Sequence, residues 1–187
     1  MYVRIGFYIL LFILIIIIIL YTHVDSNEKI FNKEIWPVKK EERFDKLIVY
    51  EITDEYKDRT LFDPYTVTHI SHGILLYYIM NHINPKQYEM NLYYSIGIEI
   101  LWEIWENTDF FINVYRNYNK YSEFYMGDSI INILTDISMM IIGFLFASKY
   151  KRAFLFVIIS EIILYCKYKD NLLKNIKDII ISPLIKK

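Results

Sequence analysis

The chain has 187 residues, of which 55% are hydrophobic and 18% aromatic, and its mean hydropathy is +0.22. This composition excludes a disordered tail, a collagen-like rod and a mucin-like stalk, all of which are poor in large apolar residues. The net charge of −1 gives no basic field for nucleic acid, and the single cysteine, Cys166, excludes an internal disulfide and a cysteine-based zinc motif.

The N-terminus predicts a membrane anchor. Seventeen consecutive residues, 5–21, carry no charge, and a transmembrane helix needs about 20 mainly apolar residues. A cleaved signal peptide is the competing interpretation, with Arg4 as its basic region. We favour an uncleaved anchor over residues 1–22, because no small-x-small cleavage site follows and the apolar run is long for a signal peptide.

The next part of the chain, residues 23–62, is predicted as a polar extramembrane segment. The stretch 22–65 holds eight Lys or Arg and eleven Asp or Glu. Within it, residues 46–52 (KLIVYEI) are predicted as a short strand or helix against the membrane surface. The segment is too short to be a catalytic domain.

Four further apolar stretches, each interrupted by polar residues, cover 66–83, 91–105, 129–147 and 153–168. We predict an all-α fold, an integral membrane bundle of about five transmembrane helices in the cell or inner membrane. Residues 63–187 form the bundle with its polar pocket and tail. The competing interpretation is a soluble protein with buried core helices. In the tail, 171–187, Leu and Ile alternate with Lys at helical spacing, which predicts a surface-lying amphipathic helix that Pro183 ends.

The charges do not select one orientation in the membrane. In a five-helix topology, residues 22–65, the loop 106–127 and the tail counted from Lys167 share one side, which carries sixteen Lys or Arg against five on the other. That excess favours a cytoplasmic location for the shared side. However, the tightest basic cluster (Lys149, Lys151 and Arg152) lies in a very short loop on the other side and favours the opposite orientation.

Two histidines lie near the start of the helix predicted at 66–83. Asp63 and Pro64 are typical of a helix start. His69 and His72 follow at spacing i, i+3, which places both imidazoles on one face, where they can bind one metal ion or one carboxylate partner. The alternative is a pair of interfacial histidines at a helix end.

Three glutamates line one stripe of the next predicted helix. Glu99, Glu103 and Glu106 follow at i, i+4 and i+7. Like charges on one face repel, so these carboxylates need protons, cations or basic partners. A helix end that has reached the surface accounts for Glu106 and, less well, for Glu103. It does not account for Glu99, which lies near the middle of the apolar stretch.

Acidic and amide groups also open the helix predicted at 129–147. Asp128 is either an N-cap or a pocket residue. Asn132 and Asp136 lie one and two turns deeper on a similar face, where an ionisable group in a membrane is costly. Glu161, in the following helix, is a further buried acid.

These polar groups are predicted to converge. Successive helices enter, leave and enter on one side, so the groups occupy the same half of the membrane, and at about 1.5 Å per residue their depths are comparable. We expect one polar pocket, open to one face, formed by His69, His72, Glu99, Glu103, Glu106, Asp128, Asn132 and Asp136. Arg116, in the loop above, is placed to balance the acids or to hold a phosphate or carboxylate. Tyr115, Tyr118, Tyr121 and Tyr125 form either an aromatic rim or an interfacial belt.

A family resemblance rests on four segments in order: THISHGILLYYI (68–79), EILWEIWENTDFFINVYR (99–116), GDSIINILTDISMMIIGFLFA (127–147) and YKDNLLKNI (168–176). They resemble an uncharacterised family of multi-pass bacterial membrane proteins, domain of unknown function 2585 (uncharacterised protein family 0314), over about residues 63–185. The resemblance implies a shared membrane bundle and no activity. Its motif positions are His69, His72, Glu99, Glu103, Glu106, Asn107, Arg116, Asp128, Asn132, Asp136, Asp170 and Asn171.

A more distant resemblance is to the VanZ-like membrane proteins, which are linked to glycopeptide-antibiotic resistance. It implies a His in one helix, a Glu in the next, and an Asp-x-x-x-Asn pair that Asp128 and Asn132 match. Gly143 departs from the pattern, because it lies further along than the VanZ-like glycine.

The first functional hypothesis is an intramembrane enzyme that acts on a lipid, a lipid-linked or a phosphate-bearing substrate, with a divalent metal as its candidate cofactor. The candidate catalytic residues are Glu99, Glu103, Asp136 and Arg116. The candidate metal ligands are His69, His72, Glu103 and Asp128, and Glu106, Asn107 and Asn132 complete the pocket.

Two other functions stay open. Buried acids with histidines can relay protons or cations across a membrane, although the other half of the predicted bundle is poor in polar residues apart from Glu161. Alternatively, the polar network fixes helix register in a non-catalytic assembly or partner-binding protein. No P-loop, Rossmann fingerprint, nucleophile elbow or HExxH motif is present.

Overall fold

The structure, a computed structural model, describes residues 48, 50, 58, 60–118, 125 and 127–181. The predicted anchor at 1–22 and most of the polar segment 23–62 lie outside the described residues. Of the short element predicted at 46–52, the described part makes one isolated bridge, between Ile48 and Phe62.

The described chain is helical from Thr66 onward. The α-helices are α2 (Thr66–Ile83), α3 (Tyr88–Glu106), α4 (Asp109–Tyr118), α5 (Ile130–Lys149), α6 (Phe154–Tyr168) and α7 (Leu172–Ile176), and the π-helical turn η3 (Lys177–Ile181) follows α7. The predicted all-α class is therefore confirmed for the described residues. The four long helices α2, α3, α5 and α6 lie where the apolar stretches predict them.

Helix α4 corrects one expectation, because residues 106–127 are expected to form a loop. Phe111, Ile112 and Tyr115 are buried on one side of α4, and the Phe111 N–H donates to the Thr108 hydroxyl at the start of the helix (3.3 Å). With 10 residues, α4 is too short to be recognised as a membrane span, although its apolar side chains recur at the spacing of an amphipathic helix.

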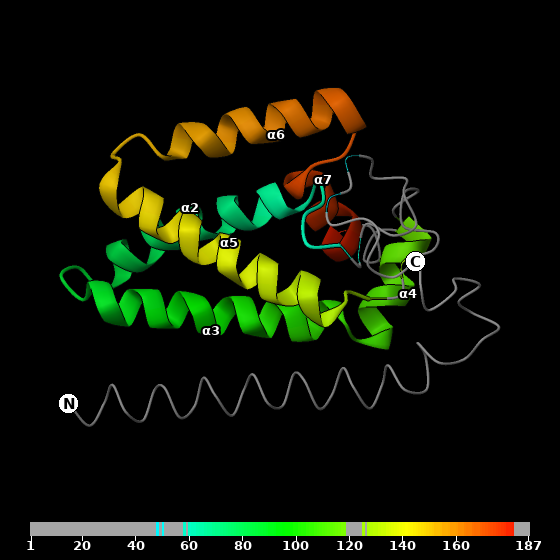
Figure 1. Cartoon of the computed structure of the whole chain (residues 1–187), viewed down its shortest axis with the longest axis horizontal. Helices are drawn as coiled ribbons and strands as arrows, with labels where there is room; N and C mark the ends of the chain where they lie inside the picture. The colour runs from blue at the N-terminus through cyan, green and yellow to red at the C-terminus, as the bar shows by residue number, and fades with distance from the viewer. Residues whose placement is uncertain are drawn as a thin grey trace. The chain divides into compact units, whose positions relative to one another are not determined.

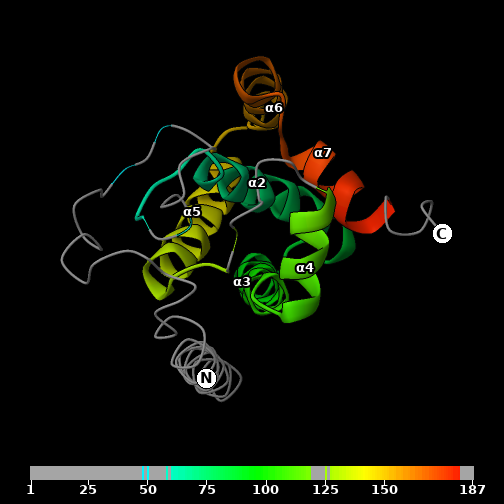
Figure 2. The same ribbon diagram turned by 90° about the vertical axis from the view of Figure 1, so that its right-hand side faces the viewer.

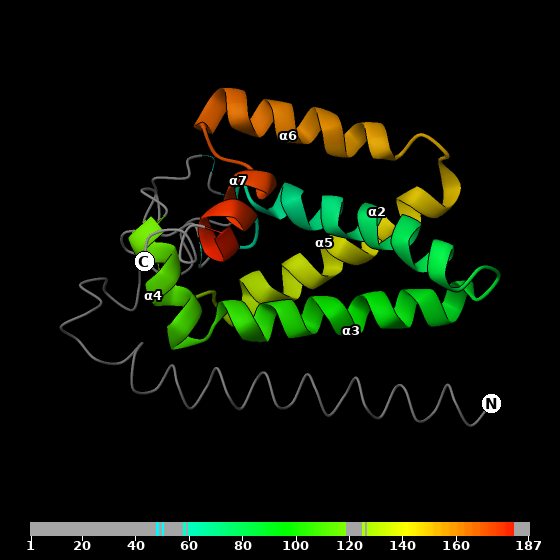
Figure 3. The same cartoon turned by 180° about the vertical axis from the view of Figure 1, so that it is seen from behind.

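Helix α2 lies at the centre of the bundle. It packs between α6 on one side and α3 and α5 on the other (Figures 1 and 2). α2 and α5 start at the same end of the bundle, and α3 ends there. α4, α7 and η3 gather at this end too (Figures 1 and 3), so it is the end at which the predicted pocket residues are placed.

Next to the two histidines, α2 packs closely against α5. A Cβ atom on Gly73 would lie 1.9 Å from the Met140 carbonyl oxygen, and one on Gly143 would lie 2.1 Å from the Ile70 carbonyl oxygen. Only glycine allows so close an approach of two helix backbones. Ile74, Met140 and Phe144 fill this region and are fully buried.

The long helices carry apolar side chains on their exposed faces and polar side chains inside. On α6, Leu155, Ile158, Ile159, Ile162 and Ile163 are all exposed. The buried side chains of the bundle include His69, Ser71, Asn91, Ser95, Glu99, Glu103, Asn132, Asp136 and Ser160. Among the described helices, α5 alone, with 20 residues and a mean hydropathy of 2.0, is long and apolar enough to cross a membrane. A buried core helix of a soluble protein can meet the same criterion.

The predicted tail helix is observed as α7 and η3, as far as residue 181. The Glu161 carboxylate of α6 accepts from the Leu172 and Leu173 N–H groups (3.3 and 3.1 Å), so this buried acid holds the start of α7. Lys174 contacts Asp170 (3.3 Å) and Asp178 (2.8 Å). Burial lowers the pKa of Lys174, but its bonds to these two acids raise it more, so the pKa is above the usual lysine range.

Candidate functional site

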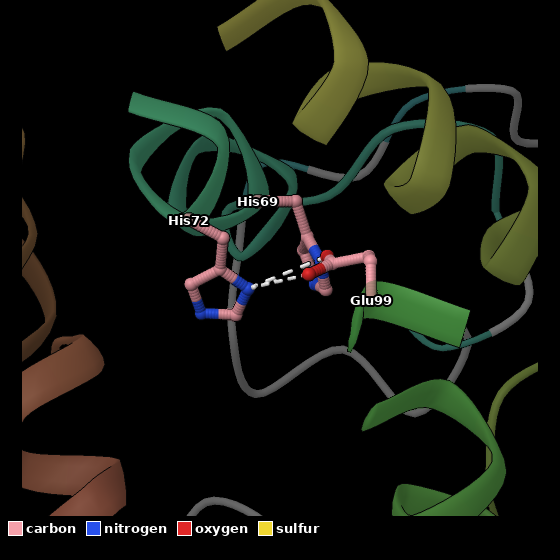
Figure 4. A group of neighbouring side chains, drawn as sticks. All are labelled: His69, His72 and Glu99. Atoms are coloured by element: carbon pink, nitrogen blue, oxygen red, sulfur yellow. Dashed lines mark hydrogen bonds and ion pairs between the residues drawn. The ribbon is translucent and has the colours of Figure 1, made fainter. Parts of the chain in front are cut away.

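Glu99 of α3 points toward the two histidines of α2, and its carboxylate contacts both (Figure 4). The Nδ1–H of His69 donates to Oε1 of Glu99 at 2.6 Å. Nδ1 of His72 lies 3.3 Å from both carboxylate oxygens. The i, i+3 spacing of the histidines puts both rings on the face of α2 that meets α3. Glu99 is fully buried, and its negative charge is matched by donors on both oxygens.

Glu103 and Asp136 are the other acids that contact His69. Oε1 of Glu103 lies 3.6 Å from Nδ1 of His69, and Oδ2 of Asp136 lies 3.6 Å from Nε2. Both distances are too long for hydrogen bonds. Three carboxylate oxygens have no hydrogen-bond partner among the described residues: Oε1 and Oε2 of Glu103 and Oδ1 of Asp136. Glu103 is 1% exposed and Asp136 5%, so both acids are buried, with these three of their four carboxylate oxygens lacking a hydrogen-bond partner in the described part of the chain.

Three overlapping groups of side chains are close enough to share a cation, with one ligand atom from each member within 4.8 Å of the others. The groups are His69, His72 and Glu99; His69, Glu103 and Asp136; and Glu103, Glu106 and Asp128. Glu103 belongs to two of them, as does His69. Of the three glutamates on this face of α3, Glu99 and Glu103 are thus buried, and Glu106 is partly exposed.

Asp128 is positioned by the turn that precedes α5. Asn107 donates its side-chain N–H to the Glu103 carbonyl oxygen (2.9 Å) and accepts from the Asp128 N–H (2.7 Å). Gly127 has a φ of +90°, a backbone conformation that favours glycine. Ser129, and not Asp128, is the N-cap of α5, since its hydroxyl accepts from the Asn132 N–H (3.2 Å). Asp128 is therefore not held in place by capping.

Two tyrosines outside the long helices donate to acids at this end of the bundle. The Tyr125 hydroxyl donates to Oδ2 of Asp128 (2.8 Å), and burial beside that carboxylate raises the pKa of Tyr125. The Tyr65 hydroxyl donates to Oδ2 of Asp170 (2.8 Å), and burial, with Tyr115 and Asp170 nearby, also raises the pKa of Tyr65. Both phenols therefore stay protonated donors over the physiological pH range.

A cavity of about 60 Å³ opens beside these groups. Its lining includes five acids, Asp58, Asp63, Glu106, Asp128 and Asp136, together with His69 and His72. Leu172, Ile176 and Ile179 of α7 and η3 also line it. The space suits several water molecules or a hydrated ion, and its lining is both acidic and apolar.

Arg116 does not line the cavity. Its Nε donates to the Tyr125 carbonyl oxygen, and burial lowers the pKa of the guanidinium. Arg116 therefore holds the backbone that leads to Asp128. Asn132 does line the cavity and donates to the Thr60 carbonyl oxygen (3.2 Å), so it joins α5 to the segment before α2.

Several lining residues were not predicted from the sequence. Asp58 lies in a segment with many acids, where nothing distinguishes it, and Asn175 lies in the tail among lysines. Tyr65 could have been noticed, because it directly follows the Asp63–Pro64 helix start. Among the predicted tyrosines, Tyr115 and Tyr125 are buried and line the cavity. The side chains of Tyr118 and Tyr121 lie outside the described part of the chain.

Residues 45–186 match the model of a family described as "Protein of unknown function (DUF2585)". The chain belongs to this family. It is 38% identical over 117 residues to a UPF0314 protein of Brucella anthropi, which covers 61% of this chain and 59% of the relative. It is 37% identical over 120 residues to a UPF0314 protein of Agrobacterium fabrum, with 62% and 60% covered.

A UPF0314 protein of Sphingopyxis alaskensis is 29% identical over 136 residues, with 71% of each chain covered. The chain spans about three fifths of the length of the first two curated relatives. No solved structure matches. The family predicted from the four sequence segments is thus confirmed, whereas the distant VanZ-like resemblance stays a prediction.

Proposed function

We propose that this chain is a multi-pass integral membrane protein of the cell or inner membrane, and that its polar pocket is an enzyme site. The site would bind a divalent cation and act on a lipid or lipid-linked substrate. The observation that carries the proposal is the carboxylate of Glu103, which is fully buried with neither oxygen hydrogen-bonded within the described structure, beside Asp136 and His69.

The distribution of apolar and polar side chains supports the membrane location. Exposed Leu and Ile on α6, with buried Ser, Asn, Glu and Asp inside the bundle, is the arrangement expected when the surrounding solvent is hydrocarbon. Helices α2, α3 and α5 have 18, 19 and 20 residues. At 1.5 Å per residue they are about 27–30 Å long, which matches the hydrocarbon thickness of a bilayer. The Ser71–Ser160 hydroxyl contact (3.2 Å) and the glycine contacts between α2 and α5 are typical of membrane helix packing.

The distances around His69 support a cation between His69, Glu103 and Asp136, which we call the first cation position. Two ligand atoms bound at about 2.1 Å to one ion lie about 3.0–3.4 Å apart, depending on the coordination angle. The 3.6 Å separation between Nε2 of His69 and Oδ2 of Asp136 is close to this range, and one ligand atom from each of His69, Glu103 and Asp136 lies within 4.8 Å of the others. An unpaired buried carboxylate costs several kcal/mol, and a divalent cation would remove that cost for both acids.

The geometry favours a division of roles that differs from the sequence-based one. Glu99 already accepts from both histidines, so it is suited to orient them. A ligating histidine usually donates its second ring N–H to a carboxylate, and His69 does so to Glu99. This leaves Nε2 of His69, which faces Asp136, as the ligand atom.

His72 is the side chain best placed for proton transfer. It lines the cavity, and its Nδ1 lies against Glu99 (Figure 4). An imidazole oriented by a carboxylate is the commonest general acid–base arrangement in enzymes. The apolar lining residues Leu172, Ile176 and Ile179 support an amphiphilic substrate, whose polar group would meet the acids and whose apolar part would meet α7 and η3.

Two observations favour this function over the alternatives. A translocation path would have to cross the region where Ile74, Met140 and Phe144 are fully buried between α2 and α5, and that region is packed and apolar. A network that only fixes helix register would be expected to satisfy its own polar atoms. Glu103 and Asp136 do not have all of theirs satisfied among the described residues.

Metal analysis of the purified full chain tests the cation. After chelator treatment in detergent, Mn²⁺ or Zn²⁺ should bind and raise the thermal unfolding temperature. Glu103→Gln should abolish both effects. Glu161→Gln, a buried acid that caps α7, is the matched control and should retain them. A native chain that neither binds these ions nor changes its unfolding temperature would overturn the cation proposal.

Reconstitution tests the enzyme. The native chain in vesicles of total bacterial lipid with Mn²⁺ should deplete one lipid class, followed by mass spectrometry, and Glu103→Gln should not. If no lipid class changes with the native chain, the enzymatic proposal is wrong even if the cation binds.

A further inference from the structure

We propose a second cation position, formed by Glu103, Glu106 and Asp128, so that the pocket holds a pair of divalent cations bridged by the Glu103 carboxylate. This inference rests on the proposed function, because the first cation position supplies the other half of the pair. In this arrangement both ions share the Glu103 carboxylate, and the second ion has only oxygen ligands.

Glu103 is the residue that links the two positions. It belongs both to the group with His69 and Asp136 and to the group with Glu106 and Asp128. Its side chain is fully buried, and both carboxylate oxygens are without hydrogen-bond partners in the described structure. A single cation bound through one oxygen would leave the other oxygen buried and unsatisfied. A bridging carboxylate, with one oxygen on each ion, satisfies both.

The charge of the pocket also matches two ions. The residues of the two positions include four carboxylates, Glu103, Glu106, Asp128 and Asp136, and one imidazole. When ionised, the four acids carry four negative charges, which two divalent cations neutralise and one does not. Asp58 and Asp63 also line the cavity, so the surroundings remain acidic.

The second position has the features of a built site. Asn107 joins the Glu103 carbonyl oxygen to the Asp128 N–H (2.9 and 2.7 Å), which fixes the separation of the two acids. The Tyr125 hydroxyl donates to Asp128 (2.8 Å), and metal-binding carboxylates are commonly held by such a hydrogen bond. Gly127 has a φ of +90°, which is strained for other residues, and a Cβ there would meet the Asn107 amide oxygen at 2.7 Å.

The ligand chemistry selects the kind of ion. The second position offers carboxylate oxygens alone, which suit Mg²⁺, Ca²⁺ and Mn²⁺, whereas the first adds an imidazole, which suits Zn²⁺ and Fe²⁺. Mn²⁺ accepts both ligand sets, and we infer a Mn²⁺ pair. Two divalent ions that share a carboxylate beside a cavity are the arrangement with which enzymes clamp both oxygens of a displacement reaction.

Mn²⁺ titration of the full chain in detergent tests the inference. The native chain should bind two Mn²⁺, and its electron paramagnetic resonance spectrum should show the hyperfine pattern of a spin-coupled pair. Asp128→Asn keeps the side-chain shape and an acceptor for Tyr125, and it should reduce the stoichiometry from two to one with an uncoupled spectrum. Glu106→Gln should do the same. Asp109→Asn, an exposed acid at the start of α4, should leave two coupled ions.

The outcomes separate this inference from the proposed function. One Mn²⁺ in the native chain, lost in Glu103→Gln but retained in Asp128→Asn, would overturn the second position and leave the first intact. No Mn²⁺ in a folded native chain would overturn both. Two coupled ions that persist in both Asp128→Asn and Glu106→Gln would show that the second ion lies elsewhere.

Discussion

At the scale of single residues, the pocket depends on how one imidazole is shared among three acids. His69 lies 2.6 Å from Glu99 and 3.6 Å from both Glu103 and Asp136. One ring has two nitrogens, so it cannot satisfy three carboxylates. The shortest contact goes to Glu99, and the other two acids remain incompletely paired. Because Glu99 is paired with His69 and Glu103 is not, we expect substitutions of these two glutamates of α3 to change the stability of the chain in opposite directions.

Without metal, Glu103→Gln should stabilise the chain, because a neutral amide replaces a buried acid that lacks partners. Glu99→Gln should destabilise it, because the carboxylate that both histidines contact is lost. Each effect should be about 1–3 kcal/mol, measured by thermal unfolding in detergent with chelator. Shifts in the same direction would contradict this account.

The sequence predicts this part of the site only up to a point. The i, i+4, i+7 spacing of the glutamates and the i, i+3 spacing of the histidines predict that the groups face each other. It does not predict that Glu99 is paired while Glu103 is not. That difference depends on the rotation of α2 against α3, and a helical repeat in one sequence carries no information on the rotation of its neighbour.

At the scale of helices, the fold depends on the close contact between α2 and α5. Gly73 and Gly143 each leave space for the backbone of the other helix. Because His69 lies on α2 and Asp136 on α5, this contact also sets the distance between these two residues. Packing of α2 against α5 therefore controls the geometry of the polar groups beside the cavity.

Gly73→Ala and Gly143→Ala should each destabilise the bundle, because the added methyl would overlap a backbone carbonyl at 1.9 or 2.1 Å. Overpacking of this kind typically costs about 1–3 kcal/mol, occasionally more, and it should also weaken Mn²⁺ binding. Thermal unfolding and metal titration measure the two effects.

Gly97→Ala is the matched control, because nothing lies within 4 Å of a Cβ at this position in α3. It should be neutral, or stabilising by about 1 kcal/mol through helix propensity. If Gly97→Ala is as harmful as Gly73→Ala, the effect arises from glycine loss in general and not from the α2–α5 contact.

The anchoring of α7 gives a second prediction at this scale. Glu161→Ala removes the acceptors of the Leu172 and Leu173 N–H groups and should release α7 and η3 from α6. Trypsin cleavage after Lys174 and Lys177 should become several-fold faster, while Glu89→Ala, an exposed acid of α3, should leave it unchanged. Equal cleavage rates in the two variants would show that Glu161 does not hold the tail.

The helices themselves were largely predictable, for a physical reason. Long apolar stretches define α2, α3, α5 and α6, because a helix of that composition is stable wherever it is buried or surrounded by lipid. Helix α4 is not predicted because it is too short for a membrane span, although its apolar side chains recur at helical spacing. They pack with Trp102, Trp105 and Ile179. The order of packing, with α2 at the centre, also depends on Gly73 and Gly143 each facing the backbone of the other helix, which the sequence alone does not establish.

At the scale of the whole molecule, the proposed membrane topology makes a direct prediction. In a multi-pass arrangement, the turns between α2 and α3 and between α5 and α6 lie on one side, and the end of α4 lies on the other. Single cysteines at Gln87, Lys151 and Asn117, all exposed positions, should be introduced into a Cys166→Ser background. A membrane-impermeant maleimide should label Gln87→Cys and Lys151→Cys from one side and Asn117→Cys from the opposite side.

Intact cells and inverted membrane vesicles provide the two sides. Labelling of all three positions from the same side would rule out helices that cross the bilayer between them. The result would also decide which face of the membrane the cavity opens to, and therefore from which aqueous compartment cations would enter.

The exposure of Cys166 on α6 gives the native chain a ready-made probe position. As the sole thiol in the sequence, it can carry a nitroxide without any engineered substitution. Paramagnetic relaxation of that nitroxide by Mn²⁺ depends steeply on the separation of the two spins, so the chain with its native sequence can report how far any bound Mn²⁺ lies from α6.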